Sequence, residues 1–570
     1  MRNSVPSSRR AFPLKKFRPV SQFSIVTRPL IKNSSLRLPA FSLLHYFLTS
    51  LLLSPCSATV SPLNLRRPSP LVHRFLPPQR RPLPRHGLPR FSHFYVVTGV
   101  SLRWIATAAG HGPSSLVIWF AAWLFLYIPL ALSVIHLSRR YPAEGGFYVW
   151  TKLAFGEQAG FLSAWMYWVS NLPYFPAVLY FAASNVLFLH PALHQYAQEP
   201  AYFVAFSALI LVGLTVLNIL GLNLAKWAHN LGAIAMWISA LIVIVLGFVA
   251  WRHFGAATSF APRNFIPTTH FQDMLFWSII IFSFIGSESA SLMAEEIKDA
   301  RRNIPRALLF AGVTIALCYM LGTFCVLLAI PSAESSNLDG LAQAIAHTTS
   351  RLHLGGITEF ASLLIVISNI GAAGAYLAAA ARLPFVAGLD GYLPAAFGKL
   401  HPRYKTPWVS VLSQGLFGIL FVFLGQVGAS VGGAYNILVA IAVVITMVPF
   451  MFLFASMIRL QNRRRFPDQL AFASPQNSPT DSQAYSAADS ASDSFTSFTS
   501  FTSFTSRILG FLGFTTSAFA TFLSLIPPPE EPHELLYLLK LLGSTAALIA
   551  LGFLIFHLGQ SRNRHTGAGP

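Results

Sequence analysis

The sequence predicts an all-α polytopic membrane protein. Of its 570 residues, 54% are hydrophobic and only 10% are charged, and the mean hydropathy is +0.56. A soluble domain typically carries about a quarter charged residues. From Phe94 onward, long uncharged runs recur with short polar breaks between them. A helix needs about 20 residues to cross the ~30 Å hydrocarbon core, so these runs predict twelve transmembrane helices.

The length rule places the twelve spans in chain order. The third and eighth are long enough to tilt strongly in the bilayer. The eighth also contains the run SNIGAAGAYLAAAAR, a small-residue face suited to close helix packing. The predicted spans are residues 94–110, 114–137, 160–189, 202–221, 228–251, 272–294, 306–330, 356–384, 407–425, 432–458, 507–526 and 536–558.

Lysine and arginine are unevenly distributed between alternate loops. With the N-terminus inside, the inner loops and the C-terminal tail carry nineteen of them, and the outer loops carry three, Arg252, Arg263 and Arg351. Cytoplasmic loops of membrane proteins carry an excess of these residues. We therefore expect a multi-pass protein of the cell (plasma) membrane with both termini in the cytoplasm.

Segments outside the spans differ in composition. Residues 1–90 hold sixteen Lys and Arg and no Asp or Glu, so the formal charge of +21 belongs mainly to them and does not indicate nucleic-acid binding. This basic, Pro- and Arg-rich segment is predicted to be disordered. It is interpreted as a cytoplasmic tail, a targeting segment or, as we favour, an extension from a misassigned start codon. Residues 459–506 form a Ser-rich linker with four Phe-Thr-Ser copies, and residues 559–570 form a cytoplasmic tail.

No enzyme signature is present in the sequence. It has no His-Glu-x-x-His pair, no phosphate-cradling Gly-Lys loop, and no Ser/His/Asp set that can be placed on facing spans. Its cysteines, Cys56, Cys318 and Cys325, make neither a disulfide framework nor a metal cluster. We therefore expect no catalytic residue, no metal and no cofactor.

Two loop motifs share one pattern. After the second span the chain reads LSRRYPAEGGFYVWTKLAFGEQAGF, in which Pro142 and Gly145-Gly146 break the helix at the membrane surface. After the sixth span it reads AEEIKDARRNIPRAL, with Pro305 placed to open the next helix. Together these motifs resemble the amino acid–polyamine–organocation superfamily of transporters, and the resemblance covers residues 94–458.

The resemblance implies a leucine-transporter-type fold. Spans 1–5 and 6–10, within residues 91–458, would form two inverted repeats of five helices, and residues 507–558 would add two helices. In such folds spans 1 and 6 are discontinuous and face the substrate near the middle of the membrane.

It also implies a secondary transporter, a permease or exchanger that moves amino acids or related amines by alternating access. The expected partners are this small molecule and the lipid bilayer, without nucleic acid. A polyamine or organic-cation transporter, and a non-transporting sensor with the same fold, remain as alternatives.

The sixth span contains a polar break in FSFIGSESASLMAEE. A broken helix is tolerated in a membrane only where it lines a cavity or is buried in protein. Gly286 lets the backbone open, and its amide and the hydroxyls of Ser283 and Ser287 are candidates to hold a substrate carboxylate or ammonium. Glu288 is a candidate functional residue, because burying an acidic group inside a membrane span is costly. It pairs with a substrate amine, titrates, or only holds the break in shape.

The first span reads TGVSLRWIATAAGHGP, where Gly99 and Ser101 supply the break. Arg103 lies about 14 Å from the inner edge at 1.5 Å per residue, and a cation at that depth must pair or face water. Three interpretations stay open. Arg103 replaces a coupling cation or attracts an anionic group of the substrate, it pairs with Glu288, or it reaches the membrane surface because the span begins elsewhere.

The third and fifth spans add further expectations. Asn171 and Tyr174 share a helical face with Tyr167 through i, i+4, i+7 spacing, which suits either a gate beside the cavity or a packed core. Some proton-coupled members of the superfamily carry a lysine in the fifth span. Here that span has no Lys, Asp or Glu and only His229 at its inner end, which argues against lysine-type proton symport and leaves the coupling open, with exchange as a good option.

Overall fold

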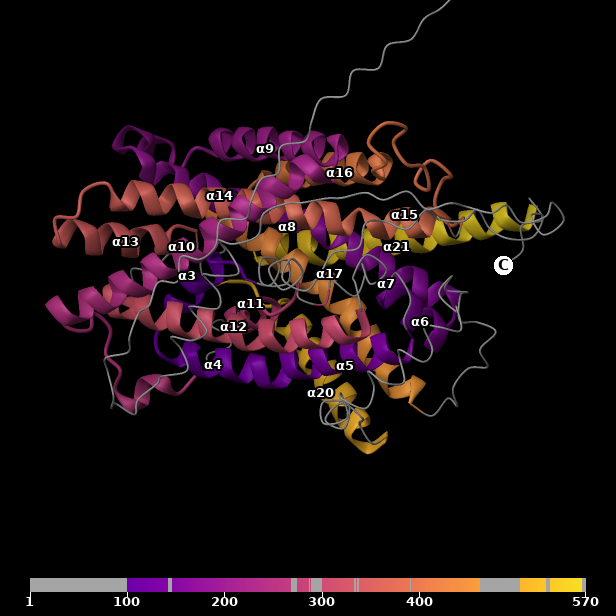
Figure 1. Cartoon of the computed structure of the whole chain (residues 1–570), viewed down its shortest axis with the longest axis horizontal. Coiled ribbons are helices and arrows are strands. Elements are labelled where there is room, and N and C mark those ends of the chain that lie inside the picture. Colours follow the sequence, from indigo (N-terminus) through magenta and orange to yellow (C-terminus); the bar gives the residue numbers. More distant parts are fainter. Residues whose placement is uncertain are drawn as a thin grey trace, which may run out of the picture. The chain divides into compact units, whose positions relative to one another are not determined.

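The computed structural model describes residues 100–141, 146–267, 274–286, 288, 300–332, 335, 338–389, 391–461, 503–528 and 534–565. Within these ranges the regular structure is helical, with no β-strand (Figure 1). The N-terminal segment 1–90, most of the Ser-rich linker, and residues 142–145 and 294–299 of the two loop motifs lie outside the described residues.

Ten helices in the described part of the chain are long and apolar enough to cross a membrane. They coincide with predicted spans two to five and seven to twelve, which makes the chain an integral multi-pass membrane protein. Their elements are α4 (Ser114–Ala122), the π-helical η1 (Trp123–Tyr127) and α5 (Ile128–Arg140), α7 (Glu157–Val169) with α8 (Asn171–Val186) and the 3₁₀ turn η2 (Leu187–Leu189), α9 (Pro200–Leu220), α10 (Leu222–Phe254), α12 (Ala300–Ala329), α14 (Ile357–Ala380) with α15 (Arg382–Leu389), α16 (Trp408–Gln426), α17 (Val431–Leu460), α20 (Ser503–Leu523) and α21 (Glu534–His565).

The remaining helices are short. They are α3 (Arg103–Ala109), α6 (Phe147–Phe155), α11 (Leu275–Phe282), α13 (Gly340–Arg351), and the 3₁₀ turns η3 (Pro191–Tyr196) and η4 (Pro262–Phe265). At 7 and 8 residues, α3 and α11 are too short to cross the membrane alone. They occupy the predicted first and sixth spans, and each adjoins non-helical backbone, at residues 100–101 and 283–286. The twelve-helix count and the inverted relation between the repeats stay predictions.

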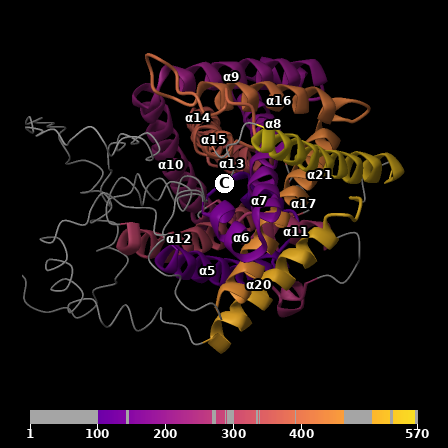
Figure 2. The same ribbon diagram turned by 90° about the vertical axis from the view of Figure 1, so that its right-hand side faces the viewer.

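These two short helices lie inside the bundle. Every residue of α3 is buried, and α3 packs against α4, α11, α12 and α13. Helix α11 contacts α3, α4, α17 and α20, and Figures 1 and 2 both show it beside α17. The irregular backbone beside each helix is therefore enclosed by protein, as a membrane interior requires.

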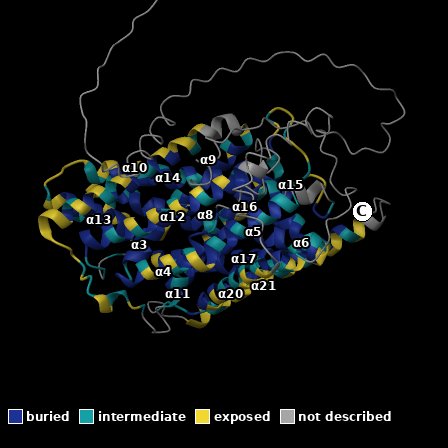
Figure 3. Cartoon of the chain, turned by 60° about the horizontal axis from the view of Figure 1, so that its bottom comes forward, coloured by how far each residue is buried: buried dark blue, intermediate teal, exposed yellow. Residues whose placement is uncertain are grey.

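The outer faces of the bundle are apolar. In Figure 3 the exposed residues run along peripheral helices such as α20 and α21. They include large hydrophobic side chains, for example Leu209, Leu416 and Leu554. The most apolar window of α21 is only 17% buried and that of α17 is 83% buried. Helix α17 therefore belongs to the core and α21 to the rim, where exposed apolar surface suits lipid.

Close packing of α10 on α14 depends on glycine. A Cβ on Gly232 would lie 2.8 Å from the Cα of Gly371, which leaves no room for a side chain. The predicted small-residue face of the eighth span is thus confirmed. The prediction for Pro305 is wrong, because α12 begins at Ala300 and Pro305 lies inside the helix. Inside the helix, a proline lacks the N–H that would donate to the carbonyl four residues earlier, and its ring crowds that carbonyl.

Candidate functional site

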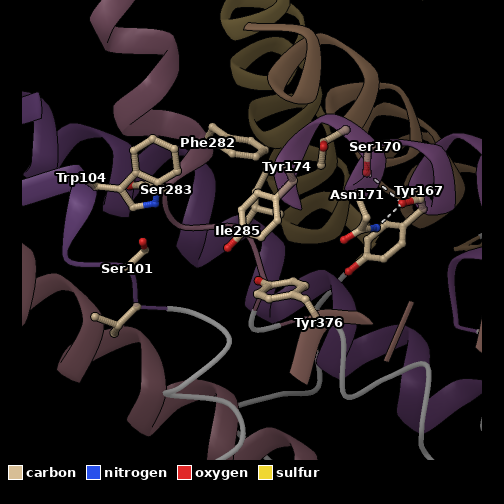
Figure 4. A pocket seen from close by; sticks show the side chains of 12 residues that line it. Ser101, Trp104, Tyr167, Ser170, Asn171, Tyr174, Phe282, Ser283, Ile285 and Tyr376 are labelled. Atoms are coloured by element: carbon tan, nitrogen blue, oxygen red, sulfur yellow. Dashed lines mark hydrogen bonds between the residues drawn. The ribbon is translucent and has the colours of Figure 1, made fainter. Parts of the chain in front are cut away.

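A cavity of about 30 Å³ lies at the two helix breaks. Four predicted site residues line it: Ser101, Asn171, Tyr174 and Ser283 (Figure 4). The other lining residues are Val100, Trp104, Tyr167, Ser170, Phe282, Ile285, Tyr376 and Thr446.

The cavity wall is aromatic with a few polar groups. Trp104, Tyr167, Tyr174, Phe282 and Tyr376 contribute rings, and serine, threonine and asparagine side chains lie between them. In Figure 4, Trp104 and Tyr167 stand at opposite sides of the view, with the ring of Tyr174 between them. None of the described residues that line the cavity carries a charge. Such a wall suits an organic molecule with a small number of polar groups.

The third span contributes the polar residues Ser170 and Asn171 to the cavity wall. Helix α7 ends at Val169 and α8 begins at Asn171, with Ser170 between them. The Ser170 hydroxyl and the Asn171 amide both donate to the carbonyl of Tyr167, each at 2.8 Å. These local bonds fix the orientation of the two side chains, as serine and asparagine commonly do near helix ends.

Glu288 holds the break after α11 in shape. It is fully buried, and it accepts hydrogen bonds from the Tyr167 hydroxyl to Oε1 (2.8 Å) and from the Gly286 amide to Oε2 (2.7 Å). Gly286 has φ of +123°, a backbone conformation that favours glycine. Neither Gly286 nor Glu288 lines the cavity, but Tyr167 lines it and binds Glu288 directly.

Arg103 does not pair with Glu288, so that prediction is wrong. The two carboxylate oxygens are bonded to Tyr167 and Gly286, and no ion pair joins the two described side chains. The guanidinium of Arg103 instead lies 3.8 Å from the ring centroid of Trp104 and 4.7 Å from that of Tyr174. Its side chain is 0% exposed, which also rules out a position at the membrane surface.

Tyr319 on α12 forms hydrogen bonds to both helix breaks. The sequence did not predict it as a site residue. Its hydroxyl accepts from the Ser101 amide (3.0 Å) and donates to the Ser283 carbonyl (3.2 Å). The ring stacks on Trp119, with centroids 4.5 Å apart. A single tyrosine within an apolar span gives no signal in the sequence, because its partners lie 218 and 36 residues away.

Two predicted site residues, Gly99 and Ser287, lie outside the described residues. The structure therefore brings together four of the nine predicted residues as lining groups and places Arg103, Gly286 and Glu288 next to them. No group of three or more metal-binding side chains occurs in the part of the chain that the structure covers.

The family follows from a comparison over most of the chain. Residues 91–556 match the family model described as amino acid permease. The chain belongs to the amino acid permease family. The resemblance inferred from the two loop motifs is thereby confirmed, and it extends beyond residue 458 to include the last two helices.

Several curated transporters are similar to this permease. An uncharacterized transporter of Legionella pneumophila is 28% identical over 64% of the chain and 79% of its own length. A probable agmatine/putrescine antiporter, AguD of Lactococcus lactis, is 22% identical over 60% of the chain and 73% of its own. The low-affinity putrescine importer PlaP of Escherichia coli is 26% identical over 61% and 74%, respectively.

Proposed function

We propose that the chain is a secondary transporter, a permease or exchanger that moves amino acids or closely related amines by alternating access. The observation that carries this proposal is the cavity lined from both helix breaks, at residues 100–104 and 282–285. Membership of the amino acid permease family and the names of the relatives support the same reading. The topology proposed from the loop charges puts both termini in the cytoplasm.

The two sides of the site have opposite electrostatic character. The turn that follows α11 carries the carbonyl end of a helix and the carboxylate of Glu288, which favour a substrate ammonium. Arg103 lies against Trp104 and Tyr174 and favours a carboxylate. The aromatic wall can enclose an apolar side chain. An amino acid zwitterion matches all three features.

A polyamine is the second candidate, because two relatives are named for putrescine. The positive charge of Arg103 disfavours binding of a polyamine. At ~6 Å and an effective dielectric constant of ~20, two like charges repel by about 3 kcal/mol. No lining residue within the described part of the cavity is acidic and able to offset that repulsion. We therefore favour the amino acid.

Exchange is the proposed mode of transport. The apolar stretch of α10 from residue 228 to 251 has no Lys, Asp or Glu, and its single ionisable side chain is His229. Arg103 is a buried cation near the cavity, and we propose that it takes the place of a coupling ion. Precursor–product antiport needs no bound ion, so it does not require an acidic residue or a lysine in the fifth span.

Reconstitution into liposomes tests the proposal. Uptake of radiolabelled amino acids and amines is measured with and without unlabelled counter-substrate inside. We expect at least one amino acid to enter, and internal counter-substrate to accelerate its entry. If correctly folded protein takes up no member of the panel, the transporter assignment is wrong and the sensor alternative replaces it.

A further inference from the structure

Arg103 is a buried cation without an adequate counter-charge in the described structure. Its side chain is 0% exposed, and its Nε and Nη1 atoms have no hydrogen-bond partner. Burying a charge is costly unless it is paired and hydrogen-bonded. Glu288, a buried carboxylate of the neighbouring break, is already bonded to Tyr167 and Gly286. Within the described residues, the hydrogen bonding of the Arg103 guanidinium is therefore incomplete.

Aromatic rings supply part of the missing stabilisation. Trp104 and Tyr174 present their faces to the guanidinium at 3.8 and 4.7 Å. The faces attract the positive charge, but they do not satisfy N–H groups in the guanidinium plane, which match a carboxylate.

Both residues that contact the guanidinium also line the cavity. Trp104 and Tyr174 are wall residues, whereas Arg103 itself is not. A molecule in the cavity is therefore separated from the cation by little more than an aromatic side chain. Because the surroundings are largely apolar, the charge acts on such a molecule more strongly than it would in water.

We propose that Arg103 determines substrate specificity, by making the cavity selective for molecules with a carboxylate over the corresponding amines and diamines. The proposal rests on the proposed function and names its substrate class more narrowly. A carboxylate near Trp104 and Tyr174 supplies the counter-charge that Arg103 lacks, and a second ammonium in that place is repelled. The chain thus differs in selectivity from its relatives that are named for putrescine.

Pairs of compounds that differ only by the carboxylate test this directly. Arginine and agmatine form one pair, ornithine and putrescine a second, and phenylalanine and phenethylamine a third. Binding to the purified full-length protein is measured by ligand-induced thermal stabilisation, and transport by inhibition of uptake in liposomes. For the pair that binds, we expect the amino acid to bind at least about tenfold more tightly than its amine.

Substitutions at Arg103 separate charge from packing. In Arg103→Gln we expect the preference to fall to within about threefold, chiefly through weaker binding of the amino acid, because the neutral amide no longer attracts the carboxylate. Arg103→Lys keeps the charge and should retain a preference for the amino acid, so it gives a result even if the glutamine variant does not fold. Arg351→Gln is the matched control, since Arg351 stacks on Phe254 at 3.9 Å on the exposed surface.

Each outcome decides the matter. Equal binding of amine and amino acid by the wild type overturns the proposal, and so does a loss in Arg103→Gln that affects both members of a pair equally. A lysine variant that loses the preference while still binding both compounds also contradicts a role for charge. Transport without carboxylate preference refutes only this inference. Absence of binding and uptake for every pair refutes the proposed function as well.

Discussion

At the residue scale, the two charged side chains near the cavity contact other protein groups and do not line the cavity themselves. Glu288 binds a backbone amide and a tyrosine, and Arg103 lies against aromatic rings. The sequence indicated that both were important because charged groups inside a span are costly. It could not indicate their partners, since the direction in which a side chain leaves one helix relative to another is set by packing.

Glu288→Gln should destabilise the protein and slow transport. A glutamine oxygen can replace one acceptor, but its amide nitrogen cannot accept the second of the two hydrogen bonds from Tyr167 and Gly286. We expect a loss of about 1–3 kcal/mol in the free energy of unfolding. A thermal or denaturant unfolding series on purified protein measures it.

Tyr167→Phe provides the control for that measurement. It removes only the hydroxyl that donates to Glu288, so the two substitutions together should cost less than the sum of their separate effects. Strict additivity would mean that the Tyr167–Glu288 hydrogen bond contributes nothing to the break.

Tyr319→Phe should disconnect the two breaks without unfolding the protein. The ring stack on Trp119 remains, whereas the Ser101 amide and the Ser283 carbonyl each lose a partner. An unsatisfied buried group costs about 1–3 kcal/mol, so we expect a lower melting temperature and slower initial uptake. Tyr180→Phe is the matched control, because Tyr180 donates to Gln426 away from the cavity. Wild-type uptake in Tyr319→Phe would show that the bridge between the breaks has no role.

At the element scale, the extent of the long helices was predictable and the finer structure was not. Apolar runs of about 20 residues identify spans because each must cover the hydrocarbon core. The breaks at residues 100–101 and 283–286 were expected from Gly99, Ser101 and Gly286, although Gly99 lies outside the described residues. The break between α7 and α8 at Ser170 and the position of Pro305 inside α12 were missed. At Ser170 the hydroxyl donates to the Tyr167 carbonyl three residues earlier, a local bond that residue type alone does not predict.

Gly286→Ala tests the break after α11. At φ of +123° an alanine is strained, and such conformations cost about 1–3 kcal/mol. We expect reduced uptake together with a lower melting temperature. Gly213→Ala on α9 should leave both unchanged, because a Cβ there meets nothing within 4 Å. Normal uptake by Gly286→Ala would show that this turn need not keep its present conformation.

At the scale of the whole molecule, the predicted family, the predicted all-helical class and the predicted membrane insertion agree with the structure and with the family match. The apolar outer faces of α9, α16 and α21 suit lipid, and the family match spans residues 91–556. Orientation in the membrane is a separate matter, and it rests on the loop charges alone. It was predicted from nineteen basic residues against three, a difference that does not depend on residues 1–90.

Cysteine labelling from one side of the membrane tests the orientation. Arg351 and Arg403 are both exposed, in loops predicted to lie outside and inside. We expect a membrane-impermeant maleimide to label Arg351→Cys on intact cells and Arg403→Cys only after permeabilisation. Cys318 and Cys325 are buried and should not react. The reverse pattern would invert the proposed topology.

The central claim is that a small carboxylate-bearing molecule passes through the cavity between α3 and α11. The most direct measurement compares amino acid uptake into liposomes that contain wild-type protein with uptake into liposomes that contain Ser283→Trp, whose larger side chain would fill the cavity. We expect counter-substrate-accelerated uptake by the wild type and uptake at the level of empty liposomes for a folded Ser283→Trp protein. Undiminished uptake by that variant would contradict the claim.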